Sequence, residues 1–323
     1  MMSAIIMNCA GFFVGIGGIE LAFRRQGFNI VYSNEIDKYA TATYEANHSI
    51  KVDNRSIDLV KASEIPEFDI MLAGWPCQPF SIAGYQQGFE DEKGRGVLFF
   101  QLERIFKEKK PPVIFLENVK NLVKHDNGNT FNTVLEKLHN AGYFVKYKVL
   151  NATAYGNIPQ NRERIYIVAF QNKEHFLNFE FPAPIQLTVL PSDLIDLNTK
   201  QDANFYYTPY NCKFYDILKK EITNPNAVYQ WRRKYVRENK KGVVPTLTAN
   251  MGTGGHNVPI VLAKHGIRKL TPAECFKVQG FPDSFVLPEH ISNTQLYKQA
   301  GNSVVVPVVE RIAREIKKII IKQ

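Results

Sequence analysis

Short apolar runs alternate with stretches of helical spacing through the first half of the chain. Continuous apolar runs at Phe68–Ala73 and Val113–Leu116 have the length of strands that are buried on both faces of a sheet. The same pattern predicts further strands over 5–10, 29–34, 147–151 and 164–170, and helices over 19–26, 38–47, 98–108 and 130–140. This alternation predicts an α/β fold with a doubly wound, mostly parallel sheet.

The pattern changes after about residue 176. The stretch to residue 262 is rich in Pro, Asn, Tyr and Lys and shows weak periodicity. Helical spacing then returns at Thr271–Val278 and at Val304–Ile320, the last being amphipathic. We therefore expect a first domain over 1–176, a smaller irregular domain over 177–262, and a return to the first domain over 263–323.

The positive charge of the chain is concentrated in one segment. The 323 residues include 40 Lys and Arg against 31 Asp and Glu, a net charge of +9. Residues 213–241 hold nine Lys or Arg against three acidic residues, with Tyr229, Trp231 and Tyr235 interleaved. This mixture favours a nucleic-acid surface over an anionic membrane surface or a solvent-exposed polar helix. No run approaches the roughly 20 apolar residues of a membrane span, so we expect a cytoplasmic protein without a membrane partner.

The cysteines point to a reactive thiol. Four are present, with neither a CxxC pair nor a histidine spaced for zinc, so we expect no disulfide framework and no metal site. Cys77 follows a predicted buried strand, at the sheet edge where ligands bind, and a nucleophilic thiolate is favoured there. Glu117 ends the next strand, and a thiol beside an acid suits covalent catalysis with proton transfer.

A glycine-rich turn at Phe12–Gly18 lies between the first strand and helix, where the backbone can approach a ligand. It is not GxGxxG, which argues against an NAD-type oxidoreductase. Glu35 follows the second strand, where a ribose would be held, although a solvated acid at a helix start is equally compatible.

Two further segments carry polar groups. Alternation along a strand at QNRER would place Arg162 and Arg164 on one face, suited to a carbonyl oxygen or a phosphate, unless they form surface salt bridges. The segment QAGNSVVVP, residues 299–307, is expected to enter the last helix, where its polar residues would serve as caps.

Taken in order, these motifs resemble one family. FxGxGG, the acid after the second strand, PCQ, ENV, QxRxR, RKLTPAEC with QGFP, and QAGNSV are similar to the motif set of DNA (cytosine-5) methyltransferases of the bacterial restriction-modification type. The resemblance runs from Phe13 to about Val306, interrupted over 177–245. It implies a Rossmann-like S-adenosylmethionine-dependent fold, with a catalytic, cofactor-binding domain over 1–176 and target recognition over 177–262.

The resemblance implies roles for individual residues. Cys77 would attack C6 of a cytosine flipped out of double-stranded DNA, within a short specific sequence, and C5 would take the methyl group of S-adenosyl-L-methionine, leaving S-adenosyl-L-homocysteine. Glu117 would hydrogen-bond or protonate N3, and Arg164 and Arg162 would bind O2. The implied cofactor-binding residues are Phe13, Ile16, Gly17, Glu35, Ile36, Ser56, Ile57, Pro76, Leu98, Asn302 and Ser303.

The basic segment and a later loop are the expected DNA contacts. The residues concerned are Arg232, Arg233, Lys234, Arg237, Thr253, Gly254 and His256. We also expect the glycine-bearing segment 81–96 to close over the flipped base as a lid.

Two positions depart from the family pattern. Gly11 stands where an acidic or hydroxyl residue is usual, and Ser56 stands where an aspartate would take the adenine amino group, a role that Asp53 or Asp58 would then assume. Cofactor affinity is the property that these departures affect.

Several further expectations follow from the resemblance. The alternatives are an RNA (tRNA) cytosine-5 methyltransferase on the same motifs and a catalytically inactive nucleic-acid-binding homologue. We expect a monomer, associated with the nucleoid, with a cognate restriction endonuclease as partner.

Overall fold

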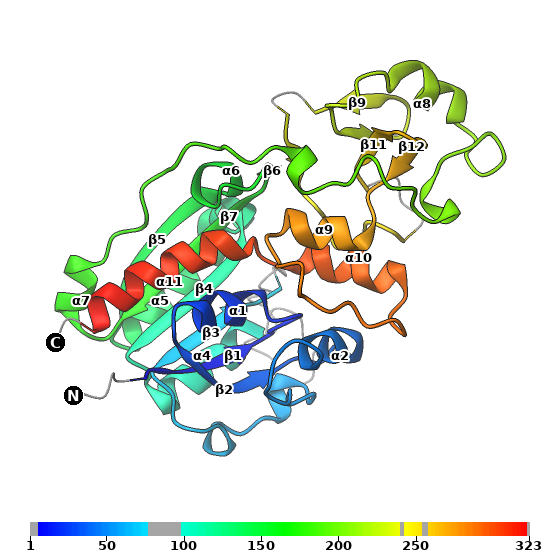
Figure 1. Cartoon of the computed structure of the whole chain (residues 1–323). Coiled ribbons are helices and arrows are strands. Elements are labelled where there is room, and N and C mark those ends of the chain that lie inside the picture. Colours follow the sequence, from blue (N-terminus) through cyan, green and yellow to red (C-terminus); the bar gives the residue numbers. More distant parts are fainter. Residues whose placement is uncertain (1–5, 77–97, 240–241, 254–257, 322–323) are drawn as a thin grey trace, which may run out of the picture. The chain divides into compact units, whose positions relative to one another are not determined.

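The computed structural model describes residues 6–76, 98–239, 242–253 and 258–321, which form two compact units (Figure 1). The first unit comprises Met1–Leu150, Glu163–Pro182 and Val309–Gln323, and the second comprises Asn151–Arg162 and Ala183–Val308. These units do not follow the boundaries expected at residues 176 and 262. Residues 263–308 group with the second unit, because their strands and helices pack with that unit's own elements.

A six-stranded sheet forms the centre of the first unit, in the order β2-β1-β3-β4-β7-β5. β1 pairs in parallel with β2 and β3, and β3 with β4, whereas β7 runs antiparallel to β4. The prediction of an α/β fold with a mostly parallel sheet is confirmed. The strands are β1 (Asn8–Phe12), β2 (Asn29–Asn34), β3 (Ile70–Gly74), β4 (Val113–Val119), β5 (Phe144–Asn151) and β7 (Glu163–Phe170).

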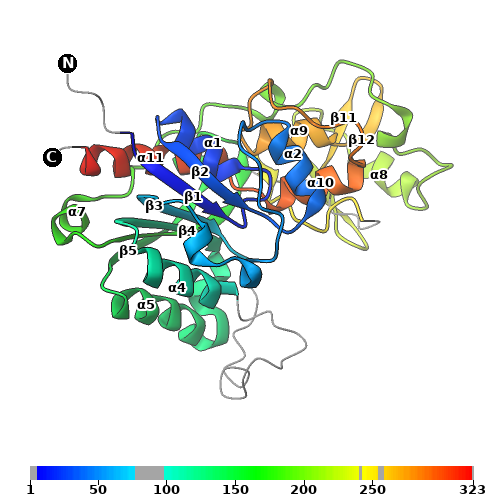
Figure 2. The same ribbon diagram turned by 90° about the horizontal axis from the view of Figure 1, so that it is seen from below.

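Helices cover both faces of this sheet. Figure 2 shows α4 and α5 on one face and α1 and α11 on the other. Contacts between α1 and α11 include hydrogen bonds from Lys317 Nζ to the Gln26 carbonyl and from Gln26 Nε2 to Glu310. The helices are α1 (Gly18–Arg25), α2 (Lys38–Glu45), α4 (Leu98–Lys109), α5 (Asn129–Asn140), α7 (Lys173–Asn178) and α11 (Val306–Ile320), with 3₁₀ turns η1 (Ile57–Leu59), η2 (Ala62–Glu64) and η3 (Lys120–Gly128).

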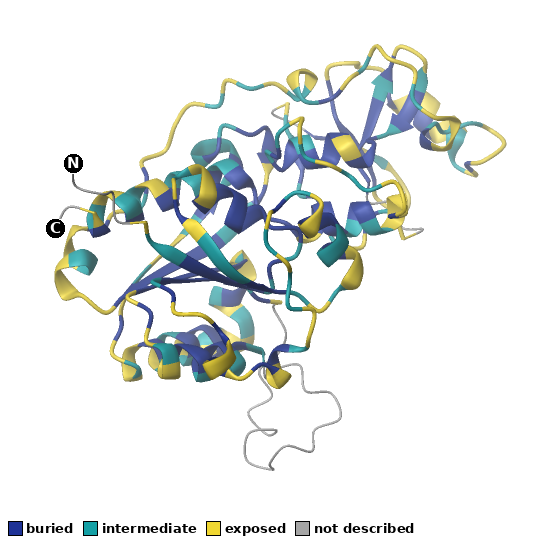
Figure 3. Cartoon of the chain, turned by 60° about the horizontal axis from the view of Figure 1, so that its bottom comes forward, coloured by how far each residue is buried: buried dark blue, intermediate teal, exposed yellow. Residues whose placement is uncertain are grey.

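The central strands are buried on both faces, as their continuous apolar runs predicted (Figure 3). Residues 70–72 of β3 and 113–116 of β4 are fully buried, and the same core takes in Phe99 and Phe106 of α4 and Phe131 of α5. Because parallel strands end at the same edge of a sheet, the segments that follow β1, β2, β3 and β4 all leave from one edge. That edge carries most of the predicted catalytic and cofactor-binding residues.

A second sheet, in the order β12-β11-β8-β9, forms the centre of the second unit. Its strands are short and antiparallel: β8 (Tyr229–Trp231), β9 (Val236–Glu238), β11 (Ile260–Ala263) and β12 (Gly266–Lys269). They share an apolar core with helix α8 (Tyr215–Glu221). The described part of the basic segment, residues 213–239, is therefore a helix followed by the β8–β9 hairpin and not a single exposed helix.

The other elements of the second unit are the paired strands β6 (Gln160–Asn161) and β10 (Val244–Pro245), α6 (Ala152–Tyr155), α9 (Pro272–Val278), α10 (Asn293–Asn302), η4 (Pro191–Asp193) and η5 (Ala203–Phe205). The helix expected at 271–278 is confirmed: Thr271 caps α9 in a reciprocal box with Glu274.

Helix α10 was not expected from the sequence. The prediction that 299–302 enter the last helix is wrong, because these residues end α10, Ser303 caps it, and α11 begins at Val306. Ser292 caps the start of α10, and buried Leu296, Tyr297 and Ala300 fix it.

A buried ion pair joins β12 to α9. Arg268, with no exposed surface, donates to both carboxylate oxygens of Glu274 at 2.7 and 2.8 Å and to the carbonyl of Asp196. Glu274 also accepts the backbone N–H of Asp196, so this pair holds the segment around Asp196 against the helix. Within the described ranges, no helix is long and apolar enough to cross a membrane.

Candidate active site

The ends of β3 and β4 place the predicted acid Glu117 at the carboxyl edge of the first unit's sheet. Glu117 is 8% exposed and pairs with Gly74, the last residue of β3. A Cβ atom at position 74 would lie 3.4 Å from Glu117 Oε2, an ordinary van der Waals contact, so the carboxylate lies directly against the end of β3. Asn118 donates to the carbonyl of Trp75 at 2.9 Å and so fixes the exit from β3. Cys77 comes two residues after Trp75 and lies outside the described residues, as does the expected lid at 81–96.

Arg164 lies beside Glu117 because β7 runs antiparallel to β4. Arg164 pairs with Val119 in the register, and its Nε lies 3.3 Å from Glu117 Oε1. Both side chains are largely buried, with 15% and 11% of their surface exposed, so the ion pair is poorly screened by water. The structure therefore brings together two of the four predicted catalytic residues as a carboxylate held by a guanidinium.

Arg162 has a different environment. The expectation that Arg162 and Arg164 share one face of a strand is wrong, because β7 begins at Glu163 and Arg162 precedes it. Within the second unit, the buried Arg162 guanidinium donates to the backbone carbonyls of Leu247, Gly301 and Ser303 at 2.6 to 3.0 Å. Two of these carbonyl groups lie at the end of α10 and the third lies just after β10. Arg162 therefore joins these two segments and has a structural role.

The glycine-rich turn after β1 is tied to Glu35. Phe13, Gly15 and Gly17 have positive φ angles of 54°, 55° and 82°. Glu35 Oε2 accepts the backbone N–H of Gly15 at 2.8 Å, and Oε1 accepts that of Asp37. Burial raises the pKa of Glu35, although these N–H groups oppose the rise. The acid predicted after the second strand thus lies against the turn predicted to approach a ligand.

The other cofactor candidates in the first unit lie near the same strand ends. Ile36 is 63% exposed, an apolar side chain open to solvent next to Glu35. Ile16 is buried in the turn, Ser56 precedes η1, Ile57 begins it, Pro76 is exposed, and Leu98 begins α4. Gly17 caps α1, and a Cβ atom there would lie 2.2 Å from His48 Nε2, so the position needs glycine for space as well as for its φ angle.

Asn302 and Ser303, the remaining cofactor candidates, belong to the second unit. Asn302 is the exposed last residue of α10, and Ser303 is its C-cap. The Ser303 carbonyl is one of the three acceptors that hold Arg162.

The two alternative acids near Ser56 already have partners. Asp53 accepts from both Arg55 and the Tyr32 hydroxyl, and the Arg55 hydrogen bond is the main reason that its pKa is lowered. Ser56 donates to Asp58. Asp53 also pairs with Asn34 in an isolated bridge, which places the 53–57 segment alongside the end of β2.

A buried acid that the sequence analysis did not single out lies beneath the glycine turn. Glu20, in the first turn of α1, is 1% exposed, and burial raises the pKa of its carboxyl to about 8. A Cβ atom at Gly11 would lie 2.4 Å from Glu20 Oε1. The absence of a side chain at Gly11, where the family usually has an acidic or hydroxyl residue, therefore leaves space for the Glu20 carboxyl of α1. The signal in the sequence was an acid two residues after the last glycine of the turn, a pattern that otherwise looks like an ordinary helix start.

Four of the seven predicted DNA contacts lie on the β8–β9 hairpin of the second unit. Arg232, Arg233 and Lys234 form its turn, Arg237 lies in β9, and all four are exposed. Thr253 is exposed and donates to the carbonyl of Asn250. Gly254 and His256 lie outside the described residues.

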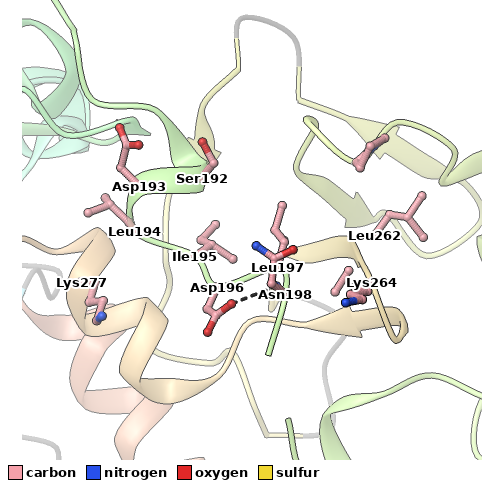
Figure 4. A pocket seen from close by; sticks show the side chains of 12 residues that line it. Ser192, Asp193, Leu194, Ile195, Asp196, Leu197, Asn198, Leu262, Lys264 and Lys277 are labelled. Carbon is pink, nitrogen blue, oxygen red and sulfur yellow. Dashed lines mark hydrogen bonds between the residues drawn. The ribbon is translucent and has the colours of Figure 1, made fainter. Parts of the chain in front are cut away.

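A cavity of about 560 Å³ opens elsewhere in the second unit, between the 192–198 segment and β11 (Figure 4). Asp196 lies in its wall, and hydrogen bonds from Thr199 and Asn198 lower the pKa of its carboxyl to about 2. None of the residues predicted for catalysis, cofactor or DNA lines this cavity. In the part of the chain that the structure describes, no three His, Cys, Asp or Glu side chains gather as a metal site.

Comparison with known proteins identifies the family to which the sequence is similar. Residues 7–318 match the family described as C-5 cytosine-specific DNA methylase. The chain is 58% identical to the type II methyltransferase M.Bsp6I of Bacillus sp. (strain RFL6), over 97% of this chain and 99% of that protein. It is 43% identical to the type II methyltransferase M.HhaI of Haemophilus parahaemolyticus, over 94% and 92% of the two chains.

A solved structure shares the fold. The crystal structure of a DNMT2 variant from Spodoptera frugiperda superposes with a TM-score of 0.76 at 21% identity, covering 96% of this chain and 99% of that one. At this identity the likeness concerns the fold alone.

Proposed function

Since this chain belongs to the C-5 cytosine-specific DNA methylase family, we propose that Cys77, Glu117 and Arg164 form its catalytic centre. Membership makes the chain a DNA methyltransferase that acts on C5 of cytosine, and S-adenosyl-L-methionine is the methyl donor general to the family. The observation that carries this assignment is the Glu117–Arg164 ion pair, located one strand from the segment that leads to Cys77.

In the proposed reaction, the Cys77 thiolate attacks C6 of a cytosine that has left the base stack, and an S–C6 bond forms. The C5–C6 π electrons form a C4–C5 double bond, and the C4–N3 π electrons move to N3. Glu117 donates a proton or a hydrogen bond to N3. C5 is then an enamine carbon and takes the methyl group, the C4–N3 double bond re-forms, and N3 returns its proton to Glu117. Loss of the C5 proton to a base restores the C5–C6 double bond and releases Cys77.

Arg164 is assigned two tasks. Its Nε holds Glu117 Oε1, which fixes the direction in which the carboxyl faces N3. The guanidinium carries five N–H donors in a planar fork, so the same group has donors left for O2 of the base. A carboxyl and a guanidinium side by side therefore match the N3 and O2 edge of cytosine.

The glycine turn fits the cofactor. The positive φ angles of Phe13, Gly15 and Gly17 bring the backbone close to any ligand at the carboxyl edge, and exposed Ile36 offers an apolar surface for a purine. Glu35, fixed by the N–H groups of Gly15 and Asp37, would accept hydrogen bonds from the ribose hydroxyls. When bound, S-adenosyl-L-methionine supplies an electrophilic methyl group. The protein's part is to hold it at the strand ends, beside Glu117.

The finer biological role is that of a modification enzyme. The relatives named above are type II methyltransferases, and we assign this chain the same role: a monomer that methylates one short duplex sequence, near the chromosome, and protects it from a cognate endonuclease. The exposed cations of the β8–β9 hairpin supply the positive charge that duplex binding needs.

The test measures transfer of labelled methyl groups from S-adenosyl-L-methionine to duplex DNA and, separately, to transfer RNA. We expect label in DNA with the wild type and with Cys212→Ala, a cysteine of the second unit, and no label with Cys77→Ala. Label in RNA alone, or retained by Cys77→Ala, would refute the assigned centre. Bisulfite sequencing of the product then locates the methylated cytosine and its sequence context.

A further inference from the structure

The turn of the β8–β9 hairpin has an unusual backbone. The Lys234 N–H donates to the carbonyl of Arg232 at 2.8 Å, two residues back, and Arg233 between them has a φ angle of 63°. A three-residue turn with a positive central φ is the rare, strained form of the γ-turn. The Arg232 N–H donates in turn to the carbonyl of Tyr235, which closes the hairpin. Arg233, which is not a glycine, thus occupies a strained position at the apex.

The strands behind this turn are firmly anchored. All three residues of β8 are buried, and the Trp231 ring stacks on Phe214 with centroids 4.0 Å apart and planes 6° from parallel. Tyr229 pairs with Ile260 of β11 and, across the hairpin, with Glu238 of β9. Side chains presented by such a rigid base are held more precisely than those on a long loop.

The charges at the apex are available to a ligand. Arg232, Arg233 and Lys234 are exposed, and among the described residues none of them forms an ion pair with an acid. Strained backbone persists where the surrounding structure enforces it, and such positions concentrate at ligand-binding sites. A two-stranded ribbon with a cationic tip has the dimensions to enter the major groove of B-form DNA.

We propose that Arg233 contacts the edge of a guanine and selects the target sequence, while Arg232 and Lys234 bind phosphates. The guanidinium fork donates two parallel hydrogen bonds, which match O6 and N7 of guanine in the major groove. Lys234 has the charge without the fork, which suits a phosphate rather than the two acceptors of guanine. The inference rests on the proposed DNA function and adds to it the residue that reads one base.

The experiment separates base selection from phosphate binding. Full-length protein methylates plasmid DNA with randomised sequence, and bisulfite sequencing gives the base preference at each position around the modified cytosine. The variants are Arg233→Lys, which keeps the charge, Arg233→Gly, which removes the side chain and suits the positive φ, and Lys234→Ala as the matched control. Fluorescence anisotropy with a duplex carrying the mapped site, in the presence of S-adenosyl-L-homocysteine, gives affinity as a function of salt.

For Arg233→Lys we expect selectivity at one G·C position to fall by about 5- to 150-fold, the range that one bidentate contact provides, with the salt slope unchanged. Arg233→Gly loses the same selectivity and melts no lower than the wild type. Lys234→Ala weakens binding to all duplexes alike and reduces the slope of log K against log salt by about 1.

The inference is overturned if Arg233→Lys keeps the wild-type preference at every position, or if Lys234→Ala loses as much selectivity. Failure of the proposed function is a different result, since the wild type would then methylate no cytosine at all.

Discussion

Replacing Glu20 by glutamine removes a buried ionisable group, and the effect on stability depends on pH. In the unfolded chain this carboxyl loses its proton near pH 4.5, whereas burial in the folded protein raises its pKa to about 8. Between these values the folded state therefore binds more protons than the unfolded state. The unfolding free energy is at its full value below pH 4.5 and declines as the pH rises to 8.

The magnitude follows from the two pKa values. Each pKa unit corresponds to about 1.4 kcal/mol, so the rise to about 8 destabilises the wild type at pH 9 by up to about 5 kcal/mol relative to pH 4.5. Entry of water and local rearrangement around the carboxylate reduce this penalty, so we expect about 2 to 5 kcal/mol. Glutamine stays neutral, and its extra N–H groups add an offset that does not change with pH.

The assay is urea denaturation of wild type and Glu20→Gln at pH 5, 6, 7, 8 and 9. The difference in unfolding free energy cancels the contribution of other groups, such as His48, whose pKa burial lowers to about 4. We expect the unfolding free energy of Glu20→Gln, relative to that of the wild type, to rise steadily from pH 5 to pH 8 and to stay constant above pH 8. The exposed Glu136 of α5 provides the control, since Glu136→Gln should give a small difference at every pH. A constant Glu20→Gln difference across this range would refute the reasoning.

Three further substitutions test other parts of the structure. Glu117→Gln should retain DNA binding but slow methyl transfer by about 10²- to 10⁴-fold, the usual contribution of a positioned acid; single-turnover rates check this, and an unchanged rate would contradict the role. Arg162→Ala leaves three buried carbonyls without their donor and should lower unfolding free energy by about 3 kcal/mol or more, measured by thermal melting. Glu274→Gln leaves Arg268 as an uncompensated buried charge and should cost about 3 to 5 kcal/mol, whereas breaking the exposed pair by Asp283→Asn should cost less than about 1 kcal/mol.

The first unit could be predicted well because its elements are long and locally specified. The 29–34 strand has the predicted limits, and the helix expected at 98–108 is one residue longer. Continuous burial of β3 and of the first half of β4 is visible in their sequences, because the side chains of a doubly covered strand are mostly apolar. The position of Glu35 and of Glu117 at strand ends follows from the same pattern.

The second unit could not be predicted in the same way. Strands of three or four residues are too short to show an alternating pattern, and β8 pairs with β11, whose partner residue Ile260 is 31 positions from Tyr229 in the sequence. Helix α10 was missed because its sequence is polar and ends in Gly-Asn, so that only burial against its own unit reveals it. The structural task of Arg162 depends on three carbonyls at distant positions, which no local spacing can indicate.

The two tryptophans of the chain are divided between the two units, and this gives the protein a spectroscopic reporter for each. Trp75 lies in the first unit at the exit of β3, and Trp231 lies in the second, stacked on Phe214 directly before the cationic turn. Both are buried, so each fluorescence emission shifts to longer wavelength when its own unit unfolds. A Trp75→Phe variant would leave Trp231 as the only tryptophan, whose emission would report the unfolding of the second unit separately and respond when a duplex reaches the hairpin.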